Sequence, residues 1–143
     1  MVRIELMNWE HARAEASRIR FKVFVEEQRV PEEMEMDEID PQCVHALAYS
    51  LDGKVVATGR LLPDGHIGRL AVLKEWRGKG IGGEVLDRLV AAARERGVVE
   101  VALSAQMHAL EFYRRHGFID EGDVYEEAGI PHQLMRKILV PTA

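Results

Sequence analysis

The sequence predicts an α+β fold, a mixed α/β arrangement in which helices flank a central, mostly antiparallel sheet. Two observations predict it. Three strand-like segments follow one another between residues 45 and 73, after an N-terminal strand and helix. A glycine-rich loop then opens a long amphipathic helix, which is followed by a strand, a short helix and a last strand. Doubly wound folds alternate strands and helices throughout, and this chain does not.

A strand, a helix and an irregular segment are predicted for the first 40 residues. Residues 2–7 alternate apolar and polar side chains, which is typical of a strand. Asn8 is a residue type that caps helices, and apolar residues follow it at helical spacing, at Ala12, Ala16, Ile19 and Val23. Residues 26–40 are rich in acids and include Pro31, so we expect a loop or a broken helix there.

Three strands are predicted next, over residues 45–51, 55–62 and 67–73. The pair Asp52-Gly53 between the first two is typical of a hairpin turn. The run Pro63-Asp64-Gly65 supplies the turn before the third. These short connections favour antiparallel neighbours.

The second half of the chain is predicted to carry two helices and two strands. The first helix has one apolar face and ends at Gly97; that face is formed by Ile81, Val85, Leu86, Leu89 and Val90. A strand at 98–103, a helix at 106–115 stopped by Gly117, and a strand at about 132–139 complete the order.

Length and composition indicate one globular domain, residues 1–143. Apolar residues make up 47% of the chain and charged residues 30%, and the net charge of −5 argues against a nucleic-acid-binding protein. Cys43 is the only cysteine, so we expect a free thiol and no disulfide framework. No apolar run approaches the length of a membrane span, and Arg3 and Glu5 stand where a signal peptide would be apolar. A cytoplasmic protein that contacts no membrane is expected.

The loop Arg77-Gly78-Lys79-Gly80-Ile81-Gly82 is the most informative feature of the sequence. Glycines allow a tight turn and a close approach of backbone N–H groups to a ligand. The helix that begins there adds unpaired N–H donors and the positive end of its dipole. This combination binds phosphate or pyrophosphate.

Two familiar phosphate-binding motifs fit the loop less well. Gly78, Gly80 and Gly83 satisfy the dinucleotide pattern G-x-G-x-x-G, but that pattern opens the first strand–helix–strand unit of a parallel sheet. Here three strands precede it. The P-loop requires Ser or Thr after the Gly-Lys pair, whereas Gly80 follows Lys79. An NAD-dependent oxidoreductase is therefore a distant alternative.

The segment Arg69–Val72 followed by Arg77–Gly82 resembles the acetyl-CoA motif of the GNAT family of N-acetyltransferases. Residues 106–118, a helix with a tyrosine and a terminal Gly-Phe, resemble the second motif of that family. Residues 24–28 and 126–132 further resemble its ElaA-like subgroup, and Lys74 departs from the family by replacing a common proline. The resemblance spans nearly the whole chain and implies the acyl-CoA N-acyltransferase fold.

That resemblance implies transfer of an acetyl group from acetyl-CoA to a primary amine by direct attack, through a tetrahedral intermediate. Backbone N–H groups of the strand before the loop would stabilise the oxyanion and pair with the pantetheine amides. The pyrophosphate would lie on the glycine loop. The implied acetyl-CoA-binding residues are Leu70, Ala71, Val72, Arg77, Gly78, Lys79, Gly80, Ile81, Gly82, Gly83 and Gln106.

Tyr113 occupies the position of the family's general acid, where a phenol can protonate the leaving thiolate. Core packing beside Phe112 is the alternative role for this side chain. Gln106 either orients the pantetheine or caps the local backbone. The general base stays open among Glu27, Asp40, His45, Glu127 and His132.

The acidic segment 26–40 is expected to be a solvated face, or else a negative rim that attracts a cationic amine. Arg60 and Arg69 either hold an anionic part of a substrate or pair with this segment. Trp76 is expected either to pack under the glycine loop, which is the preferred interpretation, or to contact the adenine of a ligand. No two histidines have the spacing of a helical metal site, so no metal is expected.

Two classes of function stay open on the sequence alone. One is an acetyl-CoA-dependent N-acetyltransferase. The other is a module that binds acyl-CoA or a nucleotide without turnover. The acceptor amine is not identified by any motif, and a homodimer through strands near the C-terminus would fit the family.

Overall fold

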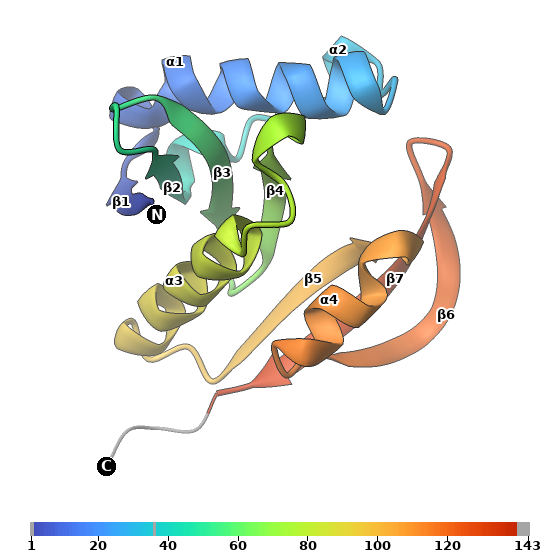
Figure 1. Cartoon of the computed structure of the whole chain (residues 1–143). Coiled ribbons are helices and arrows are strands. Elements are labelled where there is room, and N and C mark those ends of the chain that lie inside the picture. Colours follow the sequence, from blue (N-terminus) through green and yellow to red (C-terminus); the bar gives the residue numbers. More distant parts are fainter. Residues whose placement is uncertain (1, 36, 140–143) are drawn as a thin grey trace.

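The computed structural model, which describes residues 2–35 and 37–139, has the predicted α+β architecture. Its strands form two antiparallel sheets (Figure 1). The first sheet has the order β1 (Arg3–Met7), β2 (Val44–Tyr49), β3 (Val55–Leu61) and β4 (Ile67–Val72). The second has the order β5 (Glu100–Gln106), β7 (Ile130–Ile138) and β6 (Ile119–Glu127).

Helices cover both faces of the first sheet and one side of the second. The α-helices are α1 (Trp9–Arg20), α2 (Glu32–Glu35), α3 (Ile81–Glu95) and α4 (Leu110–Arg115). A π-helical segment, η1 (Phe21–Glu27), continues α1, and 3₁₀ turns occupy η2 (Asp40–Gln42), η3 (Lys74–Trp76) and η4 (Met107–Ala109). In the described residues no helix is both long and apolar enough to cross a membrane.

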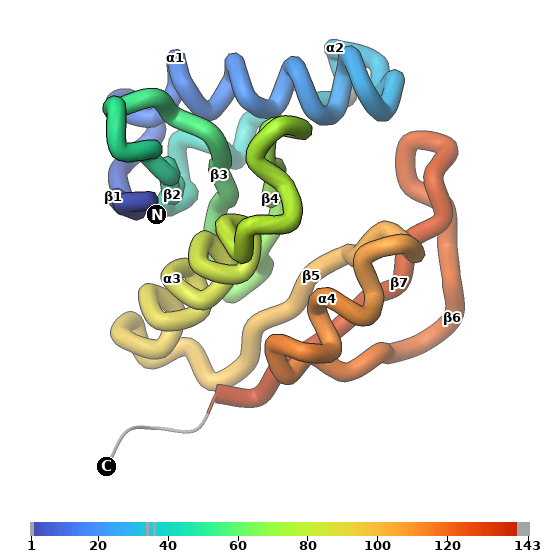
Figure 2. The backbone as a smooth tube through the Cα atoms, viewed as in Figure 1, coloured from blue at the N-terminus to red at the C-terminus, as the bar shows by residue number. Residues whose placement is uncertain are grey.

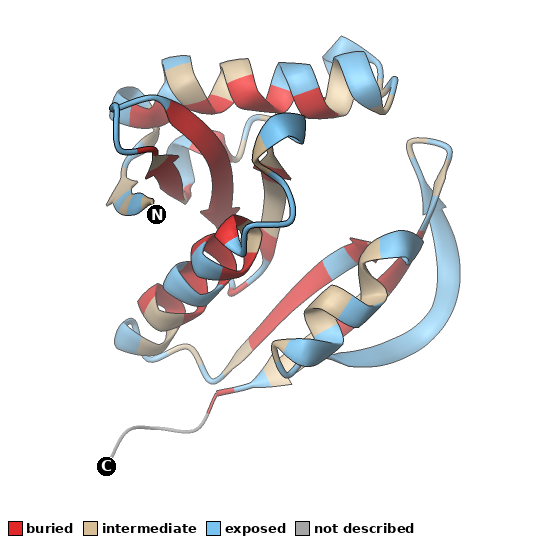
Figure 3. Cartoon of the chain, viewed as in Figure 1, coloured by how far each residue is buried: buried red, intermediate tan, exposed pale blue. Residues whose placement is uncertain are grey.

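The core lies on the two faces of the first sheet, under α1 and α3 (Figure 3). One helical face of α1 packs Ala12, Ala16 and Ile19 against Leu47 of β2. The predicted apolar face of α3 packs against the other side of the sheet and extends to β5 and β7. Each fully buried aliphatic side chain contributes about 1.5–3 kcal/mol of hydrophobic stabilisation. Because successive side chains of a strand point to opposite faces of the sheet, their order in the sequence decides which of them face α1 and which face α3.

Among the described residues, one backbone bridge joins the two sheets. His66, just before β4, forms a parallel bridge with Ala102 of β5, and the N–H of Ala102 donates to the Gly65 carbonyl at 3.2 Å. Within residues 2–35 and 37–139, no further bridge joins β4 to β5. The backbone trace shows the two strands diverging from this joint (Figure 2).

Several predicted boundaries are wrong, and one strand was not predicted. The helix predicted to begin at Gln106 begins at Leu110, because Gln106 is the last residue of β5. The unpredicted strand is β6, and all nine of its residues are exposed. A charged edge strand buries no face, so it shows no alternation of apolar residues. Its pairing with β7 explains why β7 begins earlier than expected, at Ile130.

Gly65→Ala should destabilise the protein more than Gly53→Ala. Both glycines have positive φ, 96° and 85° respectively, so the backbone strain is similar. A Cβ at Gly65 would lie 2.7 Å from the Glu100 carbonyl oxygen, whereas nothing lies within 4 Å of one at Gly53. Overpacking typically costs about 1–3 kcal/mol. Urea unfolding should show an additional loss of that size for Gly65→Ala, and equal losses would mean that the joint is not tightly packed.

Candidate active site

A cleft of about 480 Å³ opens between the two sheets. One wall comes from η1, the chain around α2, β3 and β4, and the other from β5, η4, α4 and the β6–β7 hairpin. Side chains far apart in the sequence therefore meet in it, among them Gln28, Arg69, Tyr113 and His132.

A β-bulge interrupts β4 beside this cleft. The register between β3 and β4 shifts there, so that Arg69 and Leu70 both stand opposite Gly59. Arg69 has a φ of 50°, which is uncommon for a residue other than glycine. Gly59 of β3, opposite the bulge, packs under α3. A Cβ there would lie 2.9 Å from Leu89 Cδ1, so only glycine fits without displacing a side chain of α3. Bulges bend the strand that carries them and disrupt its regular pairing.

Val72 directs its backbone polar groups to the open edge of β4. The N–H of Leu73 donates to the Val56 carbonyl of β3 at 2.9 Å. Because backbone groups alternate in direction along a strand, the N–H and C=O of Val72 point away from β3. The Val72 carbonyl accepts a hydrogen bond from Arg77 Nε at 2.9 Å, and its N–H lies on the same edge. Leu70 lines the cleft, whereas the Ala71 side chain is buried under α1.

The glycine loop has the geometry that its sequence predicts. Gly78 and Gly80 have φ of 76° and 81°, and a Cβ at either would meet nothing within 4 Å. Gly80 is the N-cap of α3 and has no side chain to bond the first turn. The first helical hydrogen bond runs from the Glu84 N–H to the Gly80 carbonyl at 3.1 Å. The N–H groups of Ile81, Gly82 and Gly83 precede that bond and have no intrahelical acceptor.

Gly83, the third glycine of the G-x-G-x-x-G pattern, packs closely against a neighbouring segment. A Cβ at Gly83 would lie 2.9 Å from the His116 ring of the neighbouring segment after α4. His116 is held there by a hydrogen bond between its Nδ1 and Asp87 Oδ1 at 2.9 Å. At Gly82 the nearest atoms are at ordinary contact distance. Gly83 thus allows α3 and α4 to approach each other, and Gly82 also lies at that contact.

Arg77 and Lys79 differ in how they are held. The Arg77 guanidinium donates two hydrogen bonds to the Glu27 carboxylate, both at 2.9 Å, in addition to its bond to Val72. Lys79 is exposed at the tip of the loop. The bidentate pair connects the loop with the end of η1, so Glu27 is engaged by a cation rather than available as a base.

Tyr113 lines the cleft from α4. The Phe112 and Phe118 rings lie edge-on to it, with centroids 5.0 Å and 6.0 Å away. Burial raises the pKa of the Tyr113 phenol from its usual value of 10 to about 12. The hydroxyl is therefore protonated at neutral pH, and it can donate a proton or a hydrogen bond.

Gln106 spans the cleft rather than capping a helix. Its Nε2 donates to Gln28 Oε1 at 2.7 Å, and this bond joins the end of β5 to the residue after η1. Gln28 belongs to the segment 24–28 that carries part of the family resemblance, but a lone glutamine has no sequence pattern that predicts its contact with Gln106. Trp76 packs against both core clusters, as expected.

A network of buried ion pairs connects the acidic segment with three arginines. Arg20 donates to both oxygens of Asp40, at 3.0 and 2.9 Å, and also pairs with Glu35. Arg60 donates to Asp40 at 2.8 Å and to Asp37 at 2.7 Å. Arg69, at the bulge, lies 3.5 Å from the same Asp37 carboxylate. The expectation of a solvated acidic face is thus wrong for these three acids.

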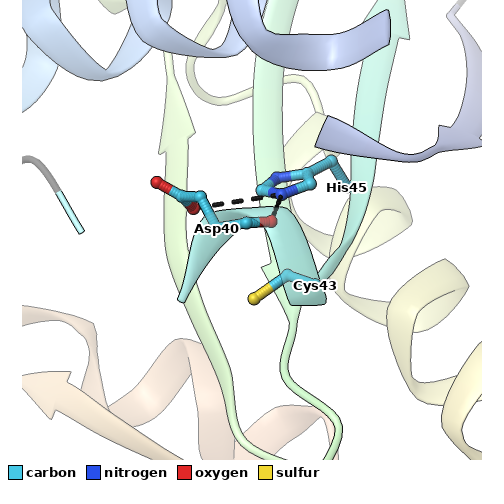
Figure 4. Close-up of side chains that lie close together, drawn as sticks. All are labelled: Asp40, Cys43 and His45. Atoms are coloured by element: carbon cyan, nitrogen blue, oxygen red, sulfur yellow. Dashed lines mark hydrogen bonds and ion pairs between the residues drawn. The ribbon is translucent and has the colours of Figure 1, made fainter. Parts of the chain in front are cut away.

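Asp40, Cys43 and His45 form a compact group within this network (Figure 4). Their ligand-type atoms lie within 4.8 Å of one another. Burial raises the pKa of the Cys43 thiol to about 11, so it stays protonated. Burial lowers the pKa of His45, whose Nε2 donates to the Asp40 carbonyl at 2.9 Å. With the Asp40 carboxylate bonded to two arginines, the chemistry of the group fits a structural role rather than a cation.

The five candidate bases are separated by their positions. Asp40 and His45 are buried in the ion-pair network, and Glu27 is bonded to Arg77. Glu127 and His132 line the cleft. The β6–β7 hairpin therefore carries the two candidates that can reach a ligand there.

Asp40→Asn should lower the free energy of unfolding by about 3–5 kcal/mol, the usual cost of removing one partner from a buried ion pair. Burial would raise the pKa of Asp40, but hydrogen bonds from Arg20 and Arg60 outweigh it and hold the pKa below its usual value. Its contribution is therefore present above pH about 4 and is lost as the pH falls through the folded-state value. Urea unfolding measured at several pH values should show that the variant loses less stability than the wild-type protein as the pH falls.

The exposed acid Glu38 offers a control in the same segment. Glu38→Gln should change stability by less than about 0.5 kcal/mol. Equal effects of the two substitutions would contradict the assignment of Asp40 as the centre of the network.

Comparison with known proteins agrees with this geometry. Residues 10–139 match the family model described as an acetyltransferase (GNAT) domain. The Bacillus subtilis protein YjcF, named as an uncharacterised N-acetyltransferase, is 40% identical over 125 residues, 83% of this chain and 87% of YjcF. An acyl-CoA N-acyltransferase from Pseudomonas aeruginosa is 31% identical with a TM-score of 0.86, covering 96% of this chain and 99% of that one. Escherichia coli ElaA is 29% identical with a TM-score of 0.83, covering 94% and 99%. The chain belongs to the GNAT family of acetyltransferases.

Proposed function

We propose that the protein transfers an acetyl group from acetyl-CoA to a primary amine by direct attack, through a tetrahedral intermediate. The observation that carries the proposal is the bulge-opened edge of β4, which leads directly into the glycine loop at the start of α3. A backbone edge for an extended ligand and a cradle for its phosphates are therefore contiguous. Tyr113 lines the same cleft.

The glycine loop supplies the donors for the pyrophosphate. Backbone N–H groups of residues 78–83 precede or begin the first turn of α3, where the helix dipole favours an anion. The open space around Gly78 and Gly80 permits close approach of phosphate oxygens. Lys79 adds positive charge at the rim, and Arg77 contributes by fixing the loop to Glu27 and Val72.

The β4 edge would hold the pantetheine arm and the reacting thioester. An extended chain with amide groups can pair with an open strand edge as an added strand does. Val72 presents the N–H donor there, Leu70 supplies an apolar wall, and Gln106 stands at the opposite side. A backbone N–H aimed at the thioester oxygen stabilises the oxyanion formed on attack.

Tyr113 would assist departure of the thiolate. A CoA thiol resembles cysteine in acidity, with a pKa of about 8.5. Because the pKa of Tyr113 is raised to about 12, complete transfer of its proton to the sulfur is uphill. The phenol therefore acts chiefly by donating a hydrogen bond as negative charge develops on sulfur. Its proton moves fully to the sulfur only when the phenol receives another proton in exchange.

Acetyl-CoA binding should fall at least tenfold more in Gly80→Asp than in Gly80→Asn. Asn and Asp both tolerate the positive φ at this position, and they have nearly the same size. Only Asp places a negative charge beside the pyrophosphate. Calorimetry with acetyl-CoA, and with NAD as the control ligand, measures the difference. Equal affinities of the two variants would remove the anion site from the loop, and tight NAD binding would favour the dinucleotide alternative.

Tyr113→Phe should lower kcat about ten- to a hundredfold and leave acetyl-CoA affinity unchanged. The ring still packs between Phe112 and Phe118, so the loss reflects the hydroxyl alone. Tyr49→Phe, a substitution on β2 outside the cleft, should leave kcat unchanged. Steady-state acetylation of a primary amine provides the measurement. Unchanged turnover in Tyr113→Phe would overturn the assigned role, and acetyl-CoA binding without acetylation of any amine would leave a binding module.

A further inference from the structure

The β6–β7 hairpin brings a histidine and a carboxylate into the cleft. Neither side chain has a role in the acetyl transfer as proposed above. His132 is buried in the middle strand of its sheet, paired in register with Gln106 on one side and Tyr125 on the other. The Tyr125 ring stacks on the imidazole, with centroids 6.1 Å apart and an interplanar angle of 28°. The Tyr125 hydroxyl in turn bonds Ser104 of β5. His132 is therefore held rigidly while it lines the cleft.

One ring nitrogen of His132 is committed to the backbone. Nδ1 lies 2.7 Å from the Ile130 carbonyl oxygen, which can only accept a hydrogen bond. Nδ1 of the neutral ring therefore carries the proton, and Nε2 presents a lone pair. A histidine fixed in this tautomer is prepared to accept a proton at Nε2.

The lone pair faces a carboxylate. Nε2 of His132 lies 3.8 Å from Oε2 of Glu127, which is about half exposed. Both atoms are acceptors when the ring is neutral, so each requires a donor from elsewhere. An ammonium group has three N–H donors and can contact both atoms at once. In the described part of the chain, no lysine or arginine lies within ion-pair distance of Glu127.

The other acids that line the cleft, Glu35 and Asp37, are already paired with arginines. Glu35 and Asp37 line the opposite wall, together with Arg60 and Arg69, and these charges pair within the buried network. Among the residues that the structure describes, Glu127 thus differs from Glu35 and Asp37 in lacking an arginine partner. This difference favours a cation as the group that binds beside it.

The remaining cleft histidines are less suited to the role. The Nδ1 of His66 pairs with Asp64 at 3.1 Å, and His66 stands at the joint between the sheets. His108 is exposed in η4. His132 alone among the three has its tautomer fixed by a backbone carbonyl.

We propose that Glu127 binds the acceptor as a cationic primary amine and that His132 is the general base that deprotonates it. This inference rests on the proposed acetyl transfer. It specifies the acceptor as an amine without an anionic group next to the nitrogen, because such a group would be repelled by Glu127.

The proton balance assigns each group one task. One proton of the ammonium moves to Nε2 of His132, giving an imidazolium and a neutral amine. The nitrogen lone pair forms the C–N bond while the carbonyl electrons move to oxygen. Re-formation of the carbonyl breaks the C–S bond, and the sulfur leaves with its electron pair. Tyr113 gives its proton to sulfur and regains one from the acetylated nitrogen, and the imidazolium returns its proton to water.

The experiment compares two acceptors and two variants of the intact protein, with a third variant as a control. Tyramine and tyrosine carry the same amine and differ by the carboxylate next to it. In His132→Asn, the amide can still donate to the Ile130 carbonyl, but Nε2 is lost. We expect kcat with tyramine to fall at least about a hundredfold.

Glu127→Gln removes the charge and keeps the size of the side chain. We expect KM for tyramine to rise about tenfold and the preference of kcat/KM for tyramine over tyrosine to shrink. Glu126→Gln, the neighbouring residue outside the cleft lining, should behave as wild type. Urea unfolding and acetyl-CoA affinity should be unchanged in each variant.

The possible failures are distinguishable. Loss of acetyl-CoA binding by the wild-type protein would reject the proposed transfer itself and this inference with it. Acetylation of neither acceptor by a protein that binds acetyl-CoA would reject the acceptor assigned here. Acetylation with a preference for tyrosine, or wild-type kinetics in His132→Asn and Glu127→Gln, would reject this inference alone.

Discussion

The architecture of the cleft depends on the narrow backbone connection between the two sheets. The Ala102 N–H bonds the Gly65 carbonyl at 3.2 Å, beside the parallel bridge of His66 with Ala102. Two twisted sheets fixed at one end diverge from that point. In the described part of the chain, the divergence leaves the β4 edge without a strand partner beyond the bridge at His66. An open edge is a liability in solution because it can pair with other chains, and the walls of the cleft shelter this one.

The position of the edge is set by buried charge. Arg69 stands at the bulge, and its guanidinium reaches Asp37, which also binds Arg60 of β3. Arg20 of α1 joins the same network through Asp40. Removing ions from water costs several kcal/mol each, and good hydrogen-bond geometry offsets that cost. The network therefore ties α1, β3, β4 and the acidic segment to one another next to the bulge.

The local parts of the site could be predicted from the sequence, and the long-range parts could not. The glycine loop, the Asp52-Gly53 hairpin and the apolar face of α3 each depend on neighbouring residues, and each appears in the structure. The bulge at Arg69 depends on space under α3 and on a carboxylate from another segment. The predicted solvated acidic face overlooked Asp37 and Asp40, because their arginine partners lie 20 or more positions away. The exposed strand β6 carries no apolar periodicity at all.

The wall of the cleft that is formed by α4 and the β6–β7 hairpin offers two different environments to titratable groups. Tyr113 packs between Phe112 and Phe118, and burial raises the pKa of its phenol, which keeps the hydroxyl protonated at neutral pH. On the β6–β7 hairpin, Glu127 is solvated and His132 presents a lone pair. Acid and base chemistry require groups whose environments separate their proton affinities. The proposed acid on α4 and the proposed base on the β6–β7 hairpin thus lie in different surroundings on one scaffold. The same difference explains why Tyr113, the proposed acid, resembles a core residue in the sequence, whereas Glu127 lies in the fully exposed strand β6.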